Sequence, residues 1–200
     1  MTPGGGCTIE NMVLTSSPGT GASAVDTRAF RRALGHFATG VTVVTYLPEG
    51  IDEFRGTTVN SFTSVSLEPP LVLVSLGRQT RAARALRPGA AFAVNVLHHG
   101  QRDLATHFAG RPEPRTRVEW EVRAGVPHLA GAGAHFRCVA QDVHGGGDHL
   151  LVVGLVEEFQ ACGQPPLLFY RGAFEHLRAP AAEPGTEIAR EIFGDFPELW

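Results

Sequence analysis

Short runs of β-branched and aliphatic residues, separated by glycine and proline, recur through most of this chain. They lie at 41–47, 54–62, 71–76, 91–97, 134–144, 148–161 and 166–172. Residues of this kind favour extended strands, and the nearly unbroken apolar run LVLVSL at 71–76 predicts a strand buried on both faces. About seven strands, mixed irregularly with short helical segments, predict an α+β or mainly β protein on an antiparallel barrel or sandwich.

The first folded element is predicted to be an amphipathic helix. Asp26 can cap a helix over 27–38, in which Phe30, Leu34 and Phe37 recur at helical spacing on one face. The expected helix therefore has an apolar stripe on one face, with Arg28, Arg31 and Arg32 elsewhere.

Two further helices and one long loop complete the expected elements. The Ala- and Arg-rich segment 80–87 and the segment 101–110 have helical propensity and end at proline or glycine. The region 111–133 is expected to be a loop in which Trp120 and Val122 are the anchors.

The chain is predicted to form one domain with two tails. Its 200 residues, 43% of them hydrophobic, suit a single core over residues 26–178. Residues 1–25 are rich in Gly, Ser, Thr and Pro and are expected to be a disordered tail. Residues 179–200 form an extension that can contain a short helix, packed on the barrel or on a partner subunit.

Composition excludes several classes of protein. A net charge of −3 argues against nucleic-acid binding, and no apolar run approaches the roughly 20 residues of a membrane helix. The first residues lack the pattern of a signal peptide, so a cytoplasmic protein is expected. Cys7, Cys138 and Cys162 are odd in number and far apart, which predicts free thiols rather than disulfides or a zinc site.

Two clusters of hydrogen-bond donors flank the run at 71–76. The stretch NSFTS at 60–64 offers an amide, several hydroxyls and the backbone of a bend, although such residues also commonly stabilise turns. Thr80 and Arg81 stand at a predicted helix start, where an anion is favoured. Loops on both sides of one strand could meet at one ligand.

Other common sites are not supported by the motifs. No GxGxxG follows the first strand, and neither a phosphate-binding P-loop nor a G-x-S-x-G nucleophile elbow is present. The neighbours His98 and His99 and the pair His144 and His149 lack the spacing of metal ligands. No metal site is expected.

An ordered series of motifs resembles the flavin reductase-like, FMN-binding split-barrel family, in particular the short-chain reductase components of two-component flavin-dependent monooxygenases. The series covers roughly residues 30–174. It consists of FRRALGHFATGVTVVT, TVNSFTSVSLEPPLVLVSL, FAVNVL with Q..LA..FAG, GDH with VVGLVEEF, and PLLFYRG.F. Each motif alone is weak evidence for the family, whereas all of them in this order and spacing form a specific signal.

The resemblance implies a Greek-key split β-barrel with accessory helices, working as a homodimer. It implies that Asn60, Ser61, Phe62, Thr63 and Ser64 line the isoalloxazine and ribityl side of the flavin, that Thr80 and Arg81 hold its phosphate, and that the nicotinamide lies against His149, Leu168, Phe169, Tyr170 and Arg171. Direct hydride transfer needs position rather than acid–base groups. His149 is therefore the one candidate for a catalytic role, as a residue that shapes the nicotinamide site.

The function implied by the resemblance is an NAD(P)H:flavin oxidoreductase. It would reduce FMN, or FAD, and supply diffusible reduced flavin to a separate monooxygenase. The alternatives are a flavin-binding storage or sensing protein of the same fold, and an FMN-dependent oxidase. The choices between FMN and FAD and between NADH and NADPH, and the identity of the monooxygenase and its substrate, stay open at this level.

Overall fold

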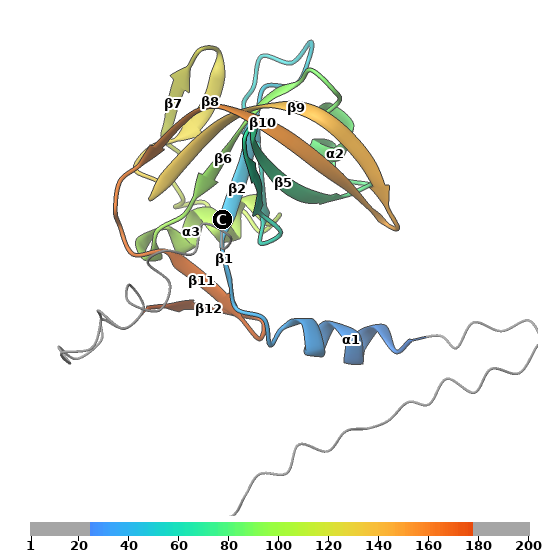
Figure 1. Cartoon of the computed structure of the whole chain (residues 1–200). Helices are drawn as coiled ribbons and strands as arrows, with labels where there is room; N and C mark the ends of the chain where they lie inside the picture. Colours follow the sequence, from blue (N-terminus) through green and yellow to red (C-terminus); the bar gives the residue numbers. More distant parts are fainter. Residues whose placement is uncertain (1–24, 178–200) are drawn as a thin grey trace, which may run out of the picture.

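The computed structural model describes residues 25–177, and its largest element is a curved seven-stranded antiparallel sheet (Figure 1). The order across the sheet is β3-β2-β6-β9-β10-β5-β4. These strands are β2 (Thr42–Tyr46), β3 (Arg55–Val59), β4 (Thr63–Leu67), β5 (Pro70–Gly77), β6 (Ala91–Val96), β9 (Ala134–Gly146) and β10 (His149–Ala161). The expected mainly β class with few helices is confirmed.

Smaller elements surround this sheet. A three-stranded sheet contains β1 (Thr39–Gly40), β11 (Leu167–Tyr170) and β12 (Ala173–His176), and β7 (Trp120–Arg123) pairs with β8 (Val126–Leu129). The helices are α1 (Thr27–Leu34), α2 (Arg81–Ala85), the 3-10 helix η1 (His99–Gln101) and α3 (Arg102–Phe108). None of the described helices is long and apolar enough to cross a membrane. The predicted tail and extension lie outside the described residues, apart from Val25.

The expected loop over 111–133 is wrong, because half of it forms the β7–β8 hairpin. The turn uses Ala124 and Gly125, both with positive φ, and each strand has only four residues, too few to show a clear alternation. Trp120 is an anchor as expected, but Val122 is 55% exposed. Strands β1, β4 and β12 were also not predicted.

Two other expectations are corrected by tertiary pairing. The first helix ends at Leu34 rather than at residue 38, because the chain beyond it turns to pair Thr39 with Phe169 of β11. The strand at 71–76 is not buried on both faces. Its burial alternates, since one face enters the core and the other is half-exposed.

The core lies within the curved sheet and contains Phe92, Val94, Val74, Val152 and Leu76. The curvature depends on register shifts between β9 and β10, one of them beside Gly154. A Cβ on Gly154 would lie 2.6 Å from the Phe92 ring, so glycine lets the bent strand close over that side chain. A second apolar cluster lies around α3 and includes Val43, Leu97 and Leu129.

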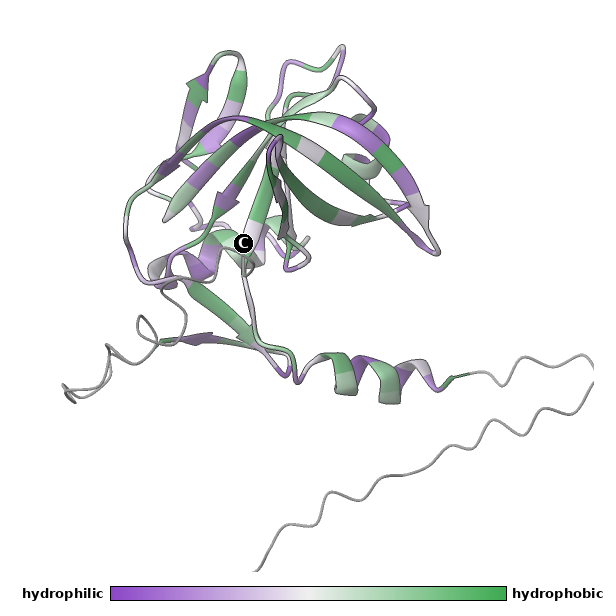
Figure 2. Ribbon diagram, viewed as in Figure 1, coloured by the Kyte–Doolittle hydropathy of each residue, from purple (hydrophilic) through white to green (hydrophobic). Residues whose placement is uncertain are grey.

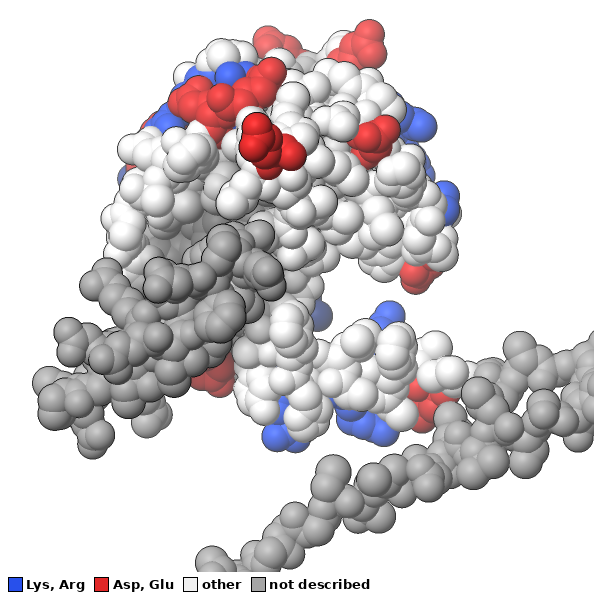
Figure 3. Space-filling view, in the orientation of Figure 1, with Lys and Arg blue, Asp and Glu red and all other residues white. Residues whose placement is uncertain are grey.

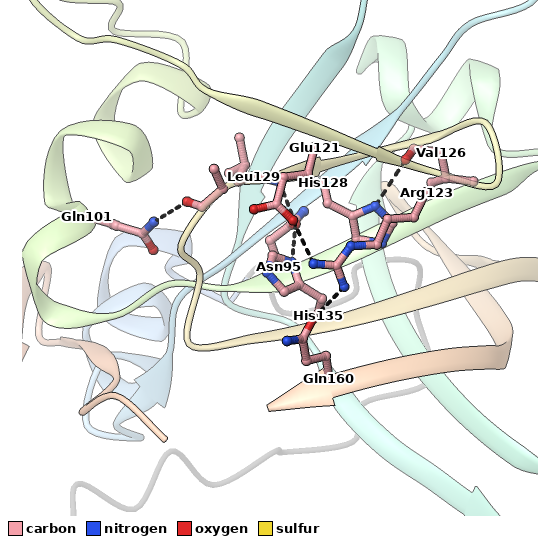
Figure 4. Close-up of polar contacts among 10 residues, drawn as sticks. Asn95, Gln101, Glu121, Arg123, Val126, His128, Leu129, His135 and Gln160 are labelled. Carbon is pink, nitrogen blue, oxygen red and sulfur yellow. Dashed lines mark hydrogen bonds and ion pairs between the residues drawn. The ribbon is translucent and has the colours of Figure 1, made fainter. Parts of the chain in front are cut away.

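Asn95 of β6 centres a buried polar network that joins four strands (Figure 4). Its amide nitrogen donates to the Val43 carbonyl and to the Thr45 hydroxyl, both at 2.9 Å. Its amide oxygen lies 2.9 Å from the Leu129 backbone nitrogen and 3.1 Å from His135 Nδ1. Asn95 therefore links β6 to β2, β8 and β9 through side-chain hydrogen bonds.

The same network extends to the β7–β8 hairpin. His128 lies beside His135, with ring centroids 5.5 Å apart, and burial lowers the pKa of both histidines. Arg123 donates to Glu121 and to Gln160 of β10, each at 2.6 Å. These contacts hold the hairpin against the main sheet.

Helix α1 projects from the molecule with an uncovered apolar face (Figures 1 and 2). Asp26 caps it as predicted, through a 2.8 Å hydrogen bond from the Arg28 backbone. No residue of α1 is buried, and Phe30 and Leu34 are 53% and 57% exposed. The expected helix is therefore present, but its apolar stripe does not reach the core of this chain.

Candidate functional site

A groove of about 240 Å³ lies where the end of β3 approaches the end of β5. It brings together four of the predicted site residues, which are Asn60, Ser61, Thr80 and His149. These residues come from three distant parts of the chain, and the curvature of the sheet is what makes them neighbours. We call this the polar groove.

The five residues of NSFTS have different surroundings. The Ser61 hydroxyl donates to the Ser75 carbonyl and accepts from the Ser75 backbone nitrogen, both at 2.9 Å, so it links the connection between β3 and β4 to β5. Phe62 packs on Phe136, with ring centroids 5.5 Å apart, beside the core. Thr63 and Ser64 are exposed on β4 and, unlike Asn60, do not line the polar groove.

Thr80 and Arg81 begin α2 as predicted. The Thr80 hydroxyl accepts from the Ala83 backbone nitrogen at 3.1 Å, which is the hydrogen bond of a helix cap. The Arg81 side chain is exposed and forms no hydrogen bond or ion pair with any residue that the structure describes. A guanidinium group is thus available beside the polar groove for an anionic ligand.

His149 enters the polar groove from the start of β10. Its Nδ1 lies 2.8 Å from the Asp148 carboxylate, and this hydrogen bond lowers the pKa of Asp148. Gly77 pairs with His149, and a Cβ at Gly77 would contact both Thr80 and the His149 ring. Gly77 therefore lies between the histidine and the helix cap, within van der Waals reach of both.

Residues 168–171, which were predicted to contact the nicotinamide, do not line the polar groove. Phe169 packs on Phe174, and Tyr170 lies edge-on to His36 at 6.4 Å. Arg171 occupies the turn between β11 and β12 with φ 49°, a conformation that is uncommon for arginine.

A second hollow, of about 780 Å³, separates α1 from the body of the molecule (Figure 3). Phe169, Arg171 and Asn60 line it, together with three arginines of α1. Within one chain, His149 and residues 168–171 therefore do not share a hollow, and Asn60 is the residue common to both.

A third hollow, of about 720 Å³, was not predicted. Phe54, Phe108 and Trp120 line it, and it meets the polar groove at Thr57 and Thr80. The sequence signal that was missed is the set of three aromatic residues in segments predicted as the start of a strand, the end of a helix and a loop. Only the folded chain brings them together.

Neither of the two cysteines that the structure describes lines these hollows. Cys138 is buried in the core, where burial raises the pKa of its thiol to about 12, and Cys162 is exposed; both are free. Cys7 lies outside the described residues. Within residues 25–177 no three His, Cys, Asp or Glu side chains are placed to hold a metal ion together.

Comparison with known proteins gives a consistent result. The family model described as the flavin reductase like domain matches residues 34–178. The chain is 43% identical over 148 residues to an NADH-dependent flavin reductase of Rhodococcus, covering 74% of this chain and 84% of that protein. It is 40% identical over 154 residues to the reductase component of a 4-hydroxyphenylacetate 3-monooxygenase of Thermus thermophilus, covering 76% and 98%.

A solved structure is similar as well. The NADH:FAD oxidoreductase SgcE6 of Streptomyces globisporus, in complex with NAD and FAD fragments, matches with a TM-score of 0.69 and 39% identity. The match covers 79% of this chain and 96% of that one. The similarity thus extends over nearly all of the described fold, including the elements that form the polar groove.

Proposed function

Because the chain belongs to the flavin reductase like family, we propose that the polar groove holds a flavin and that NADH approaches it from the side of Asn60 and His149. The chain is an enzyme, a flavin reductase that uses NADH as its reductant. The single observation that carries the site proposal is the meeting of Asn60, Thr80 and His149 in one groove, with Arg81 at its edge.

The residues of the groove fit a flavin chemically. The ring edge and ribityl chain of a flavin need neutral donors and acceptors, which the Asn60 amide and backbone groups near Ser61 offer. Its phosphate needs positive charge and hydroxyl groups, which Arg81 and the capping Thr80 offer at the adjacent rim. In this proposal Ser61 and Phe62 act by shaping the groove, while Thr63 and Ser64 lie at its outer margin.

The reaction requires two planar rings to meet in the correct orientation. A bound flavin supplies the acceptor of the hydride that NADH donates. His149 is fixed by Asp148 through Nδ1 and forms one wall where the nicotinamide would lie. Phe169 and Arg171 line the neighbouring hollow, which shares Asn60 with the polar groove. The protein accordingly contributes position and exclusion of water rather than a proton.

Replacing His149 by alanine is expected to slow flavin reduction about ten- to hundredfold, because loss of one wall misplaces the nicotinamide. Flavin affinity should change little, since the phosphate and ring contacts remain. Stopped-flow reduction by NADH, with separate titration of oxidised flavin, measures both quantities.

The matched control for this experiment is His144→Ala. His144 is exposed on the same β9–β10 hairpin but does not line the polar groove. Wild-type reduction rates in His149→Ala would refute the proposed nicotinamide site. Equal slowing in both variants would point instead to a general effect on the hairpin.

We further infer that the curved sheet is a Greek-key split barrel and that two copies form a dimer. Contacts between β3, at one edge of the sheet, and β5, near the other edge, support closure. The hydrogen bonds of Ser61, which lies two residues after β3, to Ser75 of β5 are in the same place. The exposed apolar face of α1 supports dimerisation, since a projecting helix gains stability when a second copy covers it.

Substituting aspartate for Leu34 is expected to convert the dimer to a monomer at micromolar concentration. An apolar side chain of this size contributes about 1.5–3 kcal/mol when buried, and an unpaired carboxylate in its place is unfavourable. Sedimentation velocity measures the change. Val122→Asp, at an exposed position of β7 away from α1 (Figure 1), should stay dimeric. A monomeric wild type would contradict the proposal.

A separate monooxygenase is the proposed recipient of the reduced flavin. The relative from Thermus thermophilus is named as such a reductase component, which supports this part of the proposal. The expected cytoplasmic location stays a prediction.

A further inference from the structure

The turn between β9 and β10 leads into His149 and lies at the margin of the main sheet. Strand β6 pairs with β9 only as far as Val139, and β5 pairs with β10 only as far as His149, where β5 ends at Gly77. Residues 144–148 are all exposed. In Figure 1 the two strands run side by side to a tip at the lower right of the sheet. Strand pairing with β5 and β6 therefore does not extend to the turn that precedes His149.

The turn has a composition that leaves its backbone free. Three consecutive glycines, at 145–147, precede Asp148 and His149. Glycine has more backbone freedom than any other residue, and Gly147 uses this freedom by taking φ 65°. Ordering such a segment costs more conformational entropy than ordering other residues. A contact from outside the hairpin is therefore needed to hold the turn in one conformation.

Arg78 supplies contacts of this kind. Its side-chain Nε donates a hydrogen bond to the Gly147 carbonyl at 2.6 Å, and its backbone nitrogen donates to the Asp148 carbonyl at 3.0 Å. A Cβ on Gly145 would lie 2.7 Å from Arg78 Nη2, so the guanidinium group lies directly against the backbone of the turn. Arg78 therefore contacts the turn at three of its residues.

The contacts of Arg78 reach the polar groove indirectly, through His149. Asp148, whose carbonyl accepts from Arg78, also carries the carboxylate that lies 2.8 Å from His149 Nδ1. Gly77, the neighbour of Arg78 in the chain, is the residue of β5 that pairs with His149. Arg78 itself lines neither the polar groove nor the other two hollows described above.

The segment from Gly77 to Arg81 connects the two sides of the polar groove. The Gly77 carbonyl accepts a hydrogen bond from the Thr80 backbone nitrogen at 2.9 Å, and Thr80 caps α2. Arg78 lies between these two residues and bonds to the β9–β10 turn. The side proposed for the flavin phosphate and the wall proposed for the nicotinamide are therefore fixed to one short segment.

We propose that Arg78 is a positioning residue for flavin reduction, which holds the β9–β10 turn so that the His149 ring keeps its place in the polar groove. The proposal rests on the proposed function, because it takes His149 to form the wall against which the nicotinamide lies. Hydride transfer is sensitive to small displacements, since the two rings must meet at a short distance and in the correct orientation. Loss of the Arg78 contacts therefore slows this step without weakening flavin binding.

Replacing Arg78 by alanine is expected to lower the rate of flavin reduction at saturating NADH about tenfold. The affinity for oxidised flavin and the apparent affinity for NADH should stay within about twofold, because in this proposal Arg78 touches neither ligand. Stopped-flow reduction over a series of NADH concentrations separates the rate from the apparent affinity. A direct contact between Arg78 and the phosphates of NADH would instead weaken the apparent NADH affinity at an unchanged saturating rate, and that result would overturn the proposal.

A double-mutant cycle tests whether the effect passes through the histidine. If it does, adding Arg78→Ala to His149→Ala should slow reduction by less than about a further twofold. Full, multiplicative slowing in the double variant would show that Arg78 acts by another route and would overturn the proposal. A wild-type rate in Arg78→Ala beside a slowed His149→Ala would overturn this inference alone, whereas a wild-type rate in His149→Ala would refute the proposed nicotinamide site.

Amide hydrogen exchange measures the order of the turn directly. In Arg78→Ala the amides of residues 145–149 should exchange faster, while those of the central strand β6 should not change. The controls are Gln79→Ala, at the next exposed position, and Arg87→Ala, which removes the same charge from another exposed side chain. Both should keep the reduction rate within about twofold of wild type. Unchanged exchange in the turn of Arg78→Ala, or equal slowing in a control variant, would contradict the proposed role.

Discussion

Replacing Asn95 by alanine is expected to lower the free energy of unfolding by about 3–5 kcal/mol. The substitution leaves the Leu129 backbone nitrogen, the Val43 carbonyl and the His135 ring buried without their partner. Each such group costs about 1–3 kcal/mol when it is left unpaired. Urea denaturation followed by circular dichroism measures the loss.

The matched control is Gln141→Ala, which removes a side-chain amide from β9. Gln141 is exposed and makes only a long contact of 3.4 Å to Asp142, so its replacement should change stability by less than about 0.5 kcal/mol. In Asn95→Ala, backbone amides of the β7–β8 hairpin should also exchange faster with solvent. A loss below about 1 kcal/mol would show that the network is not a principal support of the sheet.

Replacing Arg81 by alanine is expected to weaken FMN binding ten- to hundredfold. The variant removes a charge-assisted contact to the flavin phosphate, which is worth about 1.5–3 kcal/mol. The affinity for NADH should change much less. Titration of oxidised FMN, with riboflavin in parallel, isolates the phosphate contribution because riboflavin lacks that group and should bind both proteins equally.

Arg84→Ala is the control for net charge. Arg84 lies on the same short helix and carries the same charge, but it lines neither the polar groove nor the third hollow, which contains Phe54, Phe108 and Trp120. It should leave FMN affinity within about twofold. If Arg84→Ala matched Arg81→Ala, or if riboflavin binding fell equally, the phosphate would not lie at Arg81.

Much of this fold follows from local sequence. The β-branched runs form β2, β5, β6, β9 and β10 as predicted, because alternating or continuous apolar side chains stabilise strands wherever a sheet can bury them. Asp26 and Thr80 cap their helices as expected, since capping depends only on the next three residues. The ordered motifs likewise identified the family and its chemistry before any contact was known.

The uses of individual side chains were decided only by the tertiary structure. Asn60, Ser61 and Phe62 of NSFTS look alike as candidates. In the structure Ser61 forms hydrogen bonds with β5, Phe62 packs beside the core and Asn60 lines two hollows. The role of each residue depends on which strand lies opposite it. That cannot be predicted locally, because register across a sheet is a long-range property.

The third hollow could not be predicted from the sequence for the same reason, because it depends on long-range packing. Three aromatic residues, Phe54, Phe108 and Trp120, come into contact only because β3, α3 and β7 pack together. Strand β7 has only four residues, which is too short for its sequence pattern to predict that packing. The α1 stripe shows the opposite case. Its amphipathic pattern was evident from the sequence, but Phe30 and Leu34 are more than half exposed, and only the tertiary structure could show this. Local propensity determined the elements, and burial against distant partners determined the grooves.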